Sequence, residues 1–401
     1  MDDQQKTTKP LSIFVLAGDP SADNHTAPII ARIKKLNPDI HIWGVGGPRM
    51  RAAGMDTLYD YRDFSVLGVH RVIGKLAFFR KLIAQMVHLI EQRKPSLLFL
   101  VDYGAVNLRI AQIVRKSMPE LSIYQFISPQ IWASRPWRAK TIKENNINML
   151  VILPFEKALL ESLGIRTKFV GHPLVRNHGA PRRQKQDFCQ SVGLNPAHPI
   201  IAIFSGSRKQ ELEYILPVSL QAICTLLETN KCIQFVISVA DSSLEDTVRT
   251  CIDKSPASAA LDRNLFVVPA SQNHELMSHC DMAWAKSGTT TLEVALFGKP
   301  MLIYYRGSWL DYLVVSLFKT TKLVGLPNIL AGQEIVPELL QQECNPGVIA
   351  RMTKEILTNY SIYQSMSRKL LNLRAQLGSL DYVSECVREL FPPSEIATCC
   401  Q

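Results

Sequence analysis

The feature that most constrains this chain is a short, uninterrupted apolar run that ends in a polar or glycine-bearing turn and leads into a helical pattern. The run SIFVLAG at residues 12–18 precedes the turn DPSADNH and then Ile29, Ile30 and Ile33 at helical spacing. Such runs are typical of strands buried on both faces of a parallel sheet. The alternation predicts an α/β fold of doubly wound, Rossmann-like domains. Similar strand signals lie at residues 40–48, 97–101, 123–127, 149–153, 168–173, 200–204, 232–239, 265–268, 282–285 and 301–305.

Two such series are separated by a change in composition. Beyond about residue 175 the apolar periodicity is lost, and Pro181, Arg182, Arg183 and Pro196 accumulate. This composition predicts a linker and a short lead-in helix, and 401 residues are enough for two domains of ordinary size. After the second series, residues 338–340 are expected to be helical. The predicted segments are an N-terminal domain at 1–175, a linker at 176–199, a C-terminal domain at 200–365, and a helix with a tail at 366–401.

Composition and charge limit where the protein works and what it binds. The opening residues MDDQQK carry two acids and no apolar run, unlike a secretory signal, and no later segment approaches the roughly 20 apolar residues needed to span a bilayer. Nine cysteines without a C-x-x-C pair predict reduced thiols rather than disulfides or zinc ligands. We therefore expect a cytoplasmic location. The net charge of +10 favours an anionic partner, without choosing among nucleotide, phospholipid and nucleic acid.

Small residues at a helix start form the most informative turn of the second half. Ser287, Gly288 and Thr289 follow the apolar run at 282–285. A helix start presents unpaired N–H groups and the positive end of the dipole, so a turn of small residues lets a phosphate approach closely. Glu293, about one turn further on, can accept hydrogen bonds from a ribose. An ordinary N-cap explains this window equally well.

A similar turn follows the apolar run at 200–204. Gly206 and Ser207 offer a second helix start, and Arg208 offers a guanidinium for phosphate oxygens. Glu211 either orients Arg208 through a salt bridge or simply favours the first turn of the helix.

In the first half, Asp102 comes directly after the buried run at 97–101. In open parallel sheets the carboxyl ends of the strands carry ligands and chemistry, so Asp102 is a candidate catalytic carboxylate. A cap of the following helix is an equally weighted alternative. The turn at residues 19–25 resembles the first βα turn of a nucleotide-binding fold, but it lacks a G-x-G-x-x-G fingerprint, which disfavours a dinucleotide cofactor.

A helical stretch at residues 64–90 contains no acid and combines a broad apolar stripe with basic borders. Such a helix, at about 66–90, is suited to dock on an anionic membrane surface. A buried helix with a solvated basic edge explains the pattern equally well. Trp132 and Trp137 lie among arginines, where they can stack on a sugar or base, anchor at lipid, or cover the edge of a core.

Taken together, these stretches resemble the lipid A disaccharide synthases, membrane-associated glycosyltransferases of Gram-negative outer-membrane biosynthesis. The resemblance runs from about Ser12 to Gln341, and it is specific because many weak motifs occur in the family's order. The motifs are GVGGP at 44–48, SVLG at 65–68, Val101-Asp102, SPQIW at 128–132, LPFE at 153–156, GHP at 171–173, GSR at 206–208, SGTTTLE at 287–293, LPN at 326–328 and ELLQ at 338–341.

The resemblance implies a GT-B fold, in which two Rossmann-like domains face each other and a final helix crosses back to the first. It implies transfer from UDP-2,3-diacylglucosamine to 2,3-diacylglucosamine 1-phosphate, giving lipid A disaccharide 1-phosphate and UDP. The reaction would invert the anomeric centre and need no metal or other cofactor. The enzyme would work on the inner face of the inner membrane and bind no nucleic acid.

The implied chemistry gives roles to the residues already found. Asp102 would act as general base toward the acceptor hydroxyl, while Arg208 and the turn at Ser287 would neutralise the leaving UDP. Glu293 would hold the ribose, and Asn328 another part of the nucleotide. The remaining substrate-binding candidates share a place in the family's motifs: Asp19, Ser21, Asp23, Asn107, Trp132, His172, Gly206, Ser207, Glu211, Gly288 and Thr289.

Several positions depart from the family's pattern. Asp19 stands for a usual Glu, Ala22 for Gly and Ser134 for Trp, and of the usual Ala-Pro-Asp-Phe-Asn after Asp102 only Asn107 is kept. These departures gather on the acceptor side, so donor binding is the firmer prediction. The acceptor's identity, its acyl chains and the oligomeric state stay open. Two alternatives also remain: a UDP-sugar epimerase of the same fold, and a non-catalytic UDP-sugar or membrane-binding relative.

Overall fold

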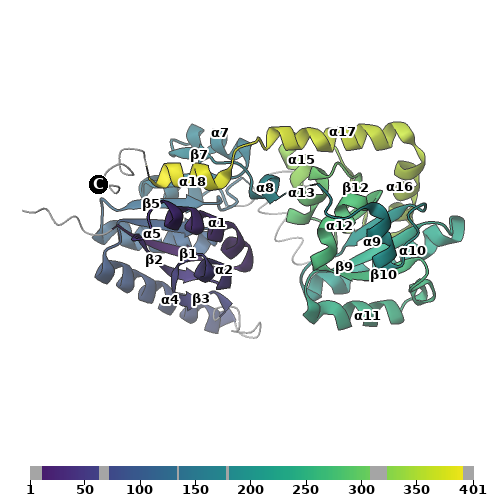
Figure 1. Cartoon of the computed structure of the whole chain (residues 1–401), viewed down its shortest axis with the longest axis horizontal. Coiled ribbons are helices and arrows are strands. Elements are labelled where there is room, and N and C mark those ends of the chain that lie inside the picture. Colours follow the sequence, from purple (N-terminus) through teal and green to yellow (C-terminus); the bar gives the residue numbers. More distant parts are fainter. Residues whose placement is uncertain (1–10, 63–71, 133–134, 178–179, 308–322, 392–401) are drawn as a thin grey trace, which may run out of the picture. The chain divides into compact units, whose positions relative to one another are not determined.

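The structure is a computed structural model that describes residues 11–62, 72–132, 135–177, 180–307 and 323–391, with only the backbone described at 72–78. The chain forms two compact units (Figure 1). The first comprises Met1–Pro173 with Leu377–Gln401, and the second comprises Leu174–Gln376.

The first unit is built on a seven-stranded parallel sheet with the order β3-β2-β1-β4-β5-β6-β7. Along β1, Ile13 and Val15 enter one hydrophobic core, whereas Phe14 and Leu16 enter the core on the other face. Burial on both faces explains why residues 13–17 of this strand are all apolar. The strands are β1 Ser12–Ala17, β2 His41–Gly46, β3 Asp56–Asp60, β4 Leu97–Val101, β5 Ser122–Phe126, β6 Ile147–Val151 and β7 Thr167–Phe169.

Helices cover both faces of this sheet (Figure 1). Residues of α1 and α18 enter one core, and residues of α4 and α5 enter the other. The strand order reverses between β1 and β4, so the turns after these strands, which begin at Asp19 and Asp102, meet at the topological switch point. The helices are α1 Pro20–Leu36, α2 Pro48–Ala52, α4 Val72–Arg93, α5 Gly104–Ser117, α6 Arg138–Glu144, α7 Pro154–Ser162 and α18 Tyr382–Leu390.

The C-terminal helix α18 completes the first unit's core beside α1 (Figure 1). Tyr382 is fully buried and stacks on Phe126 with ring centroids 6.0 Å apart, while its hydroxyl donates a 3.2 Å hydrogen bond to the carbonyl of His25. The predicted tail boundary at residue 366 falls inside α17, which belongs to the second unit. The return to the first unit begins at Leu377.

The second unit has a six-stranded parallel sheet with the order β10-β9-β8-β11-β12-β13. Its order reverses around β8, which pairs with both β9 and β11, so the turns after β8 and β11 are neighbours. The strands are β8 Ile200–Phe204, β9 Gln234–Val239, β10 Leu265–Pro269, β11 Met282–Lys286, β12 Met301–Tyr305 and β13 Glu338–Leu340. The helices are α8 Pro173–Asn177, α9 Lys185–Val192, α10 Lys209–Thr229, α11 Glu245–Asp253, α12 Asn273–His279, α13 Thr289–Leu296, α15 Leu326–Ala331, α16 Pro346–Thr358 and α17 Tyr360–Gln376.

One segment differs from the sequence-based expectation. Residues 338–340 form the edge strand β13 rather than a helix, because Leu339 pairs beside Tyr304 of β12. Three residues are too few to show a period, so their composition misled the prediction. The short helix expected between the linker and the second series corresponds to α9, whose Phe188 is fully buried in the second unit.

Candidate functional site

A pocket of about 180 Å³ lies at the carboxyl ends of β8, β9 and β11 in the second unit. It brings together residues that are far apart in sequence, because the turns after β8 and β11 meet at the switch point. Arg208 lies beside it with a side chain that is 82% exposed. The predicted residues that line the pocket are Gly206, Ser207, Glu211, Gly288 and Thr289.

Glu211 organises the charge of this pocket. One carboxylate oxygen lies 2.9 Å from Lys286 Nζ and 3.8 Å from an Arg208 Nη1, and the other accepts a 3.0 Å hydrogen bond from the Ser207 backbone N–H. Burial alone would raise the pKa of Glu211, but the hydrogen bond and charge of Lys286, joined by Ser207 and Arg208, hold that pKa below its ordinary value. The ionised carboxylate therefore aligns two cations at the mouth of the pocket.

Gly206 allows the close approach of the turn to Glu211. Its φ of 118° lies in a region that side chains rarely adopt, and a Cβ there would lie 2.5 Å from Glu211 Oε2. Gly288 differs, because its φ of 164° is ordinary extended backbone and the nearest atom to an added Cβ, Lys286 O, is 3.9 Å away. The first glycine is required by the fold, and the second leaves open space above the start of α13.

Lys286 is a site residue that the sequence reasoning missed. It is the last residue of β11, it is half-buried, and it lines the pocket beside Gly288. A lysine that ends an otherwise apolar strand, directly before a turn of small residues, was the available signal. Ser238 and Asn273 also line the pocket and are hydrogen-bonded to each other.

Ser287 and Glu293 flank the start of α13 in different ways. The hydroxyl of Ser287 donates a 2.8 Å hydrogen bond to Val324 O, so this side chain fixes the turn to a neighbouring segment. Glu293 is half-buried, burial raises its pKa, and it has no ion pair or hydrogen-bonding side-chain partner in the described part of the chain. Neither Ser287 nor Glu293 is among the residues that line the pocket, and the ribose-binding role of Glu293 stays a prediction.

Asn328 is fully buried and its side-chain amide is already satisfied. Its Nδ2 donates to Val336 O and Glu338 Oε1, both at 2.8 Å, and its Oδ1 accepts from the backbone N–H groups of Ile335 and Val336. No donor or acceptor is left for a nucleotide. We therefore assign Asn328 to holding the loop between α15 and β13 rather than to direct contact.

In the first unit, Asp102 lies in a turn of unusual backbone geometry. Asp102, Tyr103 and Ile127 have φ values of 47°, 28° and 65°, and such values are uncommon outside glycine. The buried amides of Gln125 and Asn107 hold the turn, donating to the carbonyl of Asp102 at 2.8 and 3.0 Å. Strain of this kind persists only where surrounding contacts enforce it and is concentrated at functional sites.

The carboxyl group of Asp102 has a strongly shifted pKa. Burial raises the pKa of Asp102 to about 6, the negative charge of Asp19 adds to the rise, and the Tyr103 backbone N–H opposes it. Asp19 itself caps α1 by accepting a 2.8 Å hydrogen bond from the Ala22 N–H. The two carboxylates meet at the switch point, and the pKa of Asp102 lies close to neutrality, as suits a general base.

Asp23 and Ser21 of the same helix have different surroundings. Asp23 is buried, and its carboxylate accepts backbone hydrogen bonds from Gly47, Arg49 and Met50, so it holds the turn between β2 and α2. Ser21 is exposed. The sequence placed both in a substrate site, and the contacts of Asp23 give it a structural task.

Trp132 contacts two side chains of the first unit, and His172 is buried in that unit. The Trp132 indole N–H donates a 3.0 Å hydrogen bond to Glu156, whose pKa burial raises to about 7, and the Trp132 ring packs edge-on against Phe155. Burial lowers the pKa of His172 to about 3, with a further contribution from His25, so His172 is neutral.

The predicted docking helix is only partly described. Residues 66–71 lie outside the described residues, and α4 begins at Val72. From residue 79 onward, Leu82, Met86 and Ile90 are buried in the first unit's core. This portion of the apolar stripe is therefore core rather than a free surface. Among the described helices, none has the length and apolar character to cross a bilayer.

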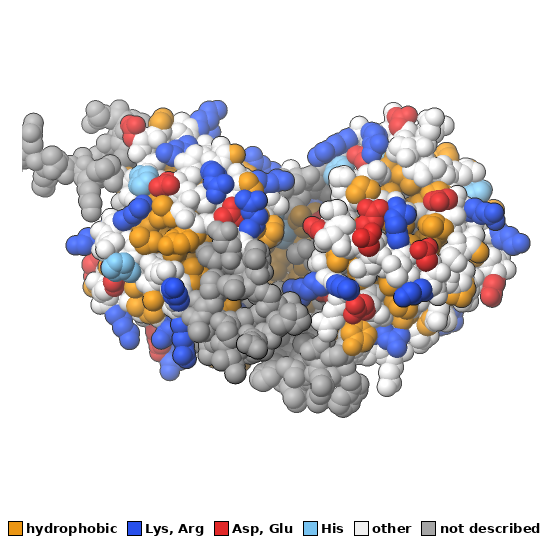
Figure 2. All heavy atoms as spheres, turned by 90° about the horizontal axis from the view of Figure 1, so that it is seen from below, with side chains coloured by type: hydrophobic (Ala, Val, Ile, Leu, Met, Phe, Trp, Pro, Cys, Tyr) orange, Lys and Arg blue, Asp and Glu red, His pale blue; other side chains and the backbone are white. Residues whose placement is uncertain are grey.

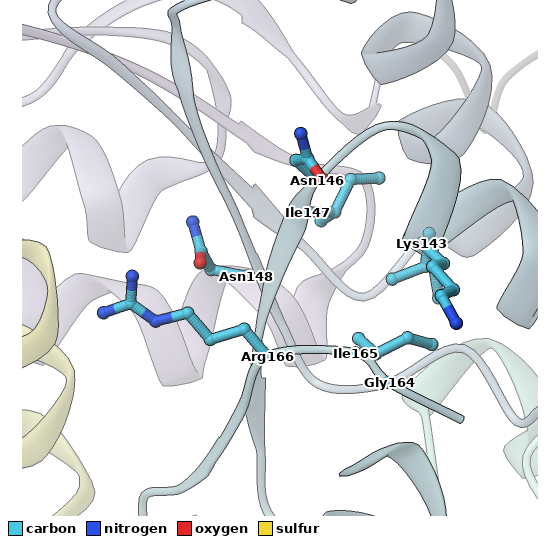
Figure 3. Close-up of a pocket in the computed structure, with 8 residues that line it drawn as sticks. Lys143, Asn146, Ile147, Asn148, Gly164, Ile165 and Arg166 are labelled. Carbon is cyan, nitrogen blue, oxygen red and sulfur yellow. The ribbon is translucent and has the colours of Figure 1, made fainter. Parts of the chain in front are cut away.

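A second pocket of about 290 Å³ lies in the first unit, at the amino ends of β6 and β7 (Figure 3). Lys143 and Arg166 are exposed there, and in Figure 3 their side chains lie to different sides of the strand. The pocket is thus remote from Asp102, which follows the carboxyl end of β4.

On the face seen in Figure 2, Lys and Arg side chains are spread over both units among acidic ones, rather than gathered in one patch.

Two parallel-sheet α/β units with polar turns at their switch points define the architecture of GT-B glycosyltransferases and related epimerases. The structure resembles a UDP-GlcNAc 2-epimerase from Neisseria meningitidis with a TM-score of 0.63 and 15% identity, covering 95% of this chain and 98% of that one. It also resembles a glycosyltransferase from Rickettsia africae with a TM-score of 0.55 and 10% identity, covering 98% of this chain and 99% of that one.

The sequence comparisons name the family. The lipid-A-disaccharide synthetase family model matches residues 13–384, and lipid-A-disaccharide synthase 1 of Legionella pneumophila (strain Lens) is 36% identical over 368 residues, covering 92% of this chain and 93% of the relative. The chain belongs to the lipid-A-disaccharide synthase family, whose members are UDP-sugar glycosyltransferases. The predicted family, fold class and enzyme class are thereby confirmed.

Proposed function

We propose that this enzyme transfers 2,3-diacylglucosamine from its UDP derivative to 2,3-diacylglucosamine 1-phosphate, with inversion at the anomeric carbon. The observation that carries the proposal is the pocket at the turns after β8 and β11, in a chain that belongs to the synthase family along most of its length. Backbone N–H groups and cations at such turns suit a diphosphate.

In this proposal the second unit binds the donor. Arg208 and Lys286, both held by Glu211, neutralise the charge that develops on the leaving UDP, and the start of α13 adds its backbone dipole. Glu293 accepts hydrogen bonds from the ribose. The epimerase from Neisseria meningitidis, which shares the fold, was solved bound to UDP-GlcNAc, and this supports a UDP-sugar ligand for the same architecture.

The first unit supplies the base and binds the acceptor. Asp102, with its pKa of about 6, is ionised at neutral pH and takes the proton of the acceptor's hydroxyl as the new glycosidic bond forms. The negative charge of Asp19 raises the pKa of Asp102 and so makes it a stronger base, and the amide of Asn107 holds the Asp102 backbone in place. We place the enzyme on the inner face of the inner membrane, where acylated substrates reside.

Product analysis tests the proposal. The purified protein is incubated in detergent with both acylated substrates, with and without added divalent cation, and the products are separated and identified by mass spectrometry. We expect the disaccharide 1-phosphate and UDP in equal amounts, with a β linkage by NMR. A parallel incubation with UDP-N-acetylglucosamine alone addresses the epimerase alternative. Formation of an epimer there, without disaccharide in the first incubation, would replace the proposal.

A further inference from the structure

Arg138, the first residue of α6, is a half-buried cation without a partner in the described part of the chain. Its guanidinium forms no ion pair or hydrogen bond with the described residues, and only another cation, Arg135, acts on it electrostatically. Burial and Arg135 both lower the pKa of Arg138, and no carboxylate opposes them. A guanidinium that is partly withdrawn from water and lacks a counter-charge is stabilised when a ligand supplies one.

Arg115, a second partly buried arginine of the same unit, shows the contrast. Its guanidinium donates to the backbone carbonyls of Asn145 and Leu121 at 3.0 and 2.9 Å, and also to that of Pro119. Arg115 thus has a complete structural role, with its donors used within the fold. Arg138 has no such set of acceptors, so its role in the folded chain is not explained by packing.

The position of Arg138 relates it to the proposed base. Its Nη1 lies 3.2 Å from where a Cβ of Gly104 would be, and Gly104 comes two residues after Asp102. A Cβ at Gly104 would also lie only 2.5 Å from Pro129 Cβ. The absence of a side chain at this position lets the guanidinium reach the turn that carries the catalytic carboxylate.

We infer that Arg138 binds the phosphate group of the acceptor and thereby selects a phosphorylated acylated sugar. This inference rests on the proposed function. The planar guanidinium offers paired donors that match phosphate oxygens. One sugar ring carries both the phosphate and the reacting hydroxyl, so a cation close to the Asp102 turn can hold the first group while the base acts on the second.

The test compares two acceptors, 2,3-diacylglucosamine with and without its 1-phosphate, in the wild type and in Arg138→Ala. We expect kcat/KM for the phosphorylated acceptor to fall roughly 10- to 150-fold in the variant, the range for a lost hydrogen bond to a charged group. The value for the acceptor without phosphate should change less than about twofold. Arg138→Lys should recover part of the preference, because it keeps the charge but not the fork.

Arg109→Ala is the matched control, because Arg109 is an exposed arginine on α5 whose guanidinium bonds only to Gln112 among the described residues. It should leave both acceptors unaffected. An equal loss with both acceptors in Arg138→Ala, or an unchanged preference, would overturn the inference. Thermal unfolding of each variant shows whether a loss of activity reflects a loss of folded protein.

A binding measurement separates this inference from the proposed function. Stabilisation of the protein against heating is recorded with each acylated sugar, with UDP, and with phosphatidylglycerol vesicles. A phosphate-dependent gain that disappears in Arg138→Ala supports the inference even if no disaccharide forms. If Arg138→Ala instead weakens only the response to vesicles or to UDP, Arg138 binds a lipid headgroup or the donor, and the inference is wrong.

Discussion

The side-chain amide of Gln125 donates a 2.8 Å hydrogen bond to the main-chain carbonyl of Asp102. The same Nε2 lies 3.2 and 3.1 Å from the carbonyls of Phe126 and Ile127, and Oε1 accepts a hydrogen bond from Asn107. One buried amide therefore joins the ends of β4 and β5, where the backbone takes its positive φ values.

Replacing Gln125 by leucine should disturb the base without removing it. The buried carbonyls of the turn would lose their donor, so we expect the free energy of unfolding to fall by about 2–4 kcal/mol. Activity should fall through kcat, with the UDP affinity within about twofold of wild type. Denaturant unfolding and steady-state kinetics measure both effects. Gln112→Leu, a surface glutamine on α5, is the control, and equal effects in the two variants would contradict the role of Gln125.

Asp102→Asn should abolish transfer while UDP binding stays nearly unchanged. Loss of the base should reduce kcat by about 10²–10⁴-fold. Because Asp102 acts in its ionised form and has a pKa of about 6, wild-type activity should rise with pH through that value. Asp19→Asn removes a negative charge that raises this pKa, so its rising limb should move to lower pH. If activity in Asp19→Asn depends on pH as it does in the wild type, a group other than Asp102 governs that pH dependence.

The raised pKa of Asp102 also predicts that Asp102→Asn stabilises the fold at high pH. The folded-state pKa of Asp102 is raised above its unfolded value of 3.8, so its stabilising contribution is complete below that value and is lost as pH rises toward 6. At pH 8 the asparagine variant should therefore be more stable than wild type by roughly 1–2 kcal/mol, after allowance for solvent screening. At pH 3 the difference should largely vanish. Thermal unfolding at the two pH values measures it, and a variant less stable at pH 8 would contradict the role of burial.

The two glycines of the pocket should respond differently to alanine. Gly206→Ala forces an unfavourable φ and a clash with Glu211, so we expect a loss of about 1–3 kcal/mol in unfolding free energy and weaker UDP binding. Gly288→Ala meets no close atom and should unfold like wild type. Chemical denaturation compares them directly. If Gly206→Ala and Gly288→Ala are equally stable, the turn before Arg208 can rearrange to accept a side chain at residue 206.

Arg208→Ala should weaken UDP binding and turnover together. The loss of one charge-assisted contact predicts an affinity about tenfold lower or more, measured by calorimetry. Lys209, exposed and next in sequence, provides the control variant Lys209→Ala, which should bind UDP normally. An Arg208→Ala protein with unchanged UDP affinity would remove Arg208 from the phosphate site.

The fold could be predicted where local sequence determines burial. Apolar runs such as residues 97–101 sit at the centre of a parallel sheet, where both faces demand apolar side chains. The strand β3, Asp56–Asp60, was not predicted, because it lies at the edge of the sheet and mixes polar with apolar residues. The turns at Gly206 and Gly288 were recognisable one by one, but their meeting in one pocket follows from strand order.

The partners of polar side chains could not be predicted, because they depend on tertiary contacts. Asn328 was expected to contact a nucleotide, yet its amide is fully used within its own unit. Gln125 looked like an ordinary strand residue, and only its contacts relate it to Asp102. Arg138 follows Trp137 and Lys286 precedes the turn at Ser287, but only their surroundings in the structure distinguish them from the many surface cations of this chain.

The burial of Tyr382 against Phe126 has a consequence for biosynthesis. A growing polypeptide emerges from the ribosome amino end first, so the sheet of residues 12–169 is made long before α18 exists. Until α18 is translated, the apolar surface that receives Tyr382, which includes the ring of Phe126, is uncovered. The nascent protein must keep that surface from aggregating, which makes the late synthesis of α18 a step that holdase chaperones can assist.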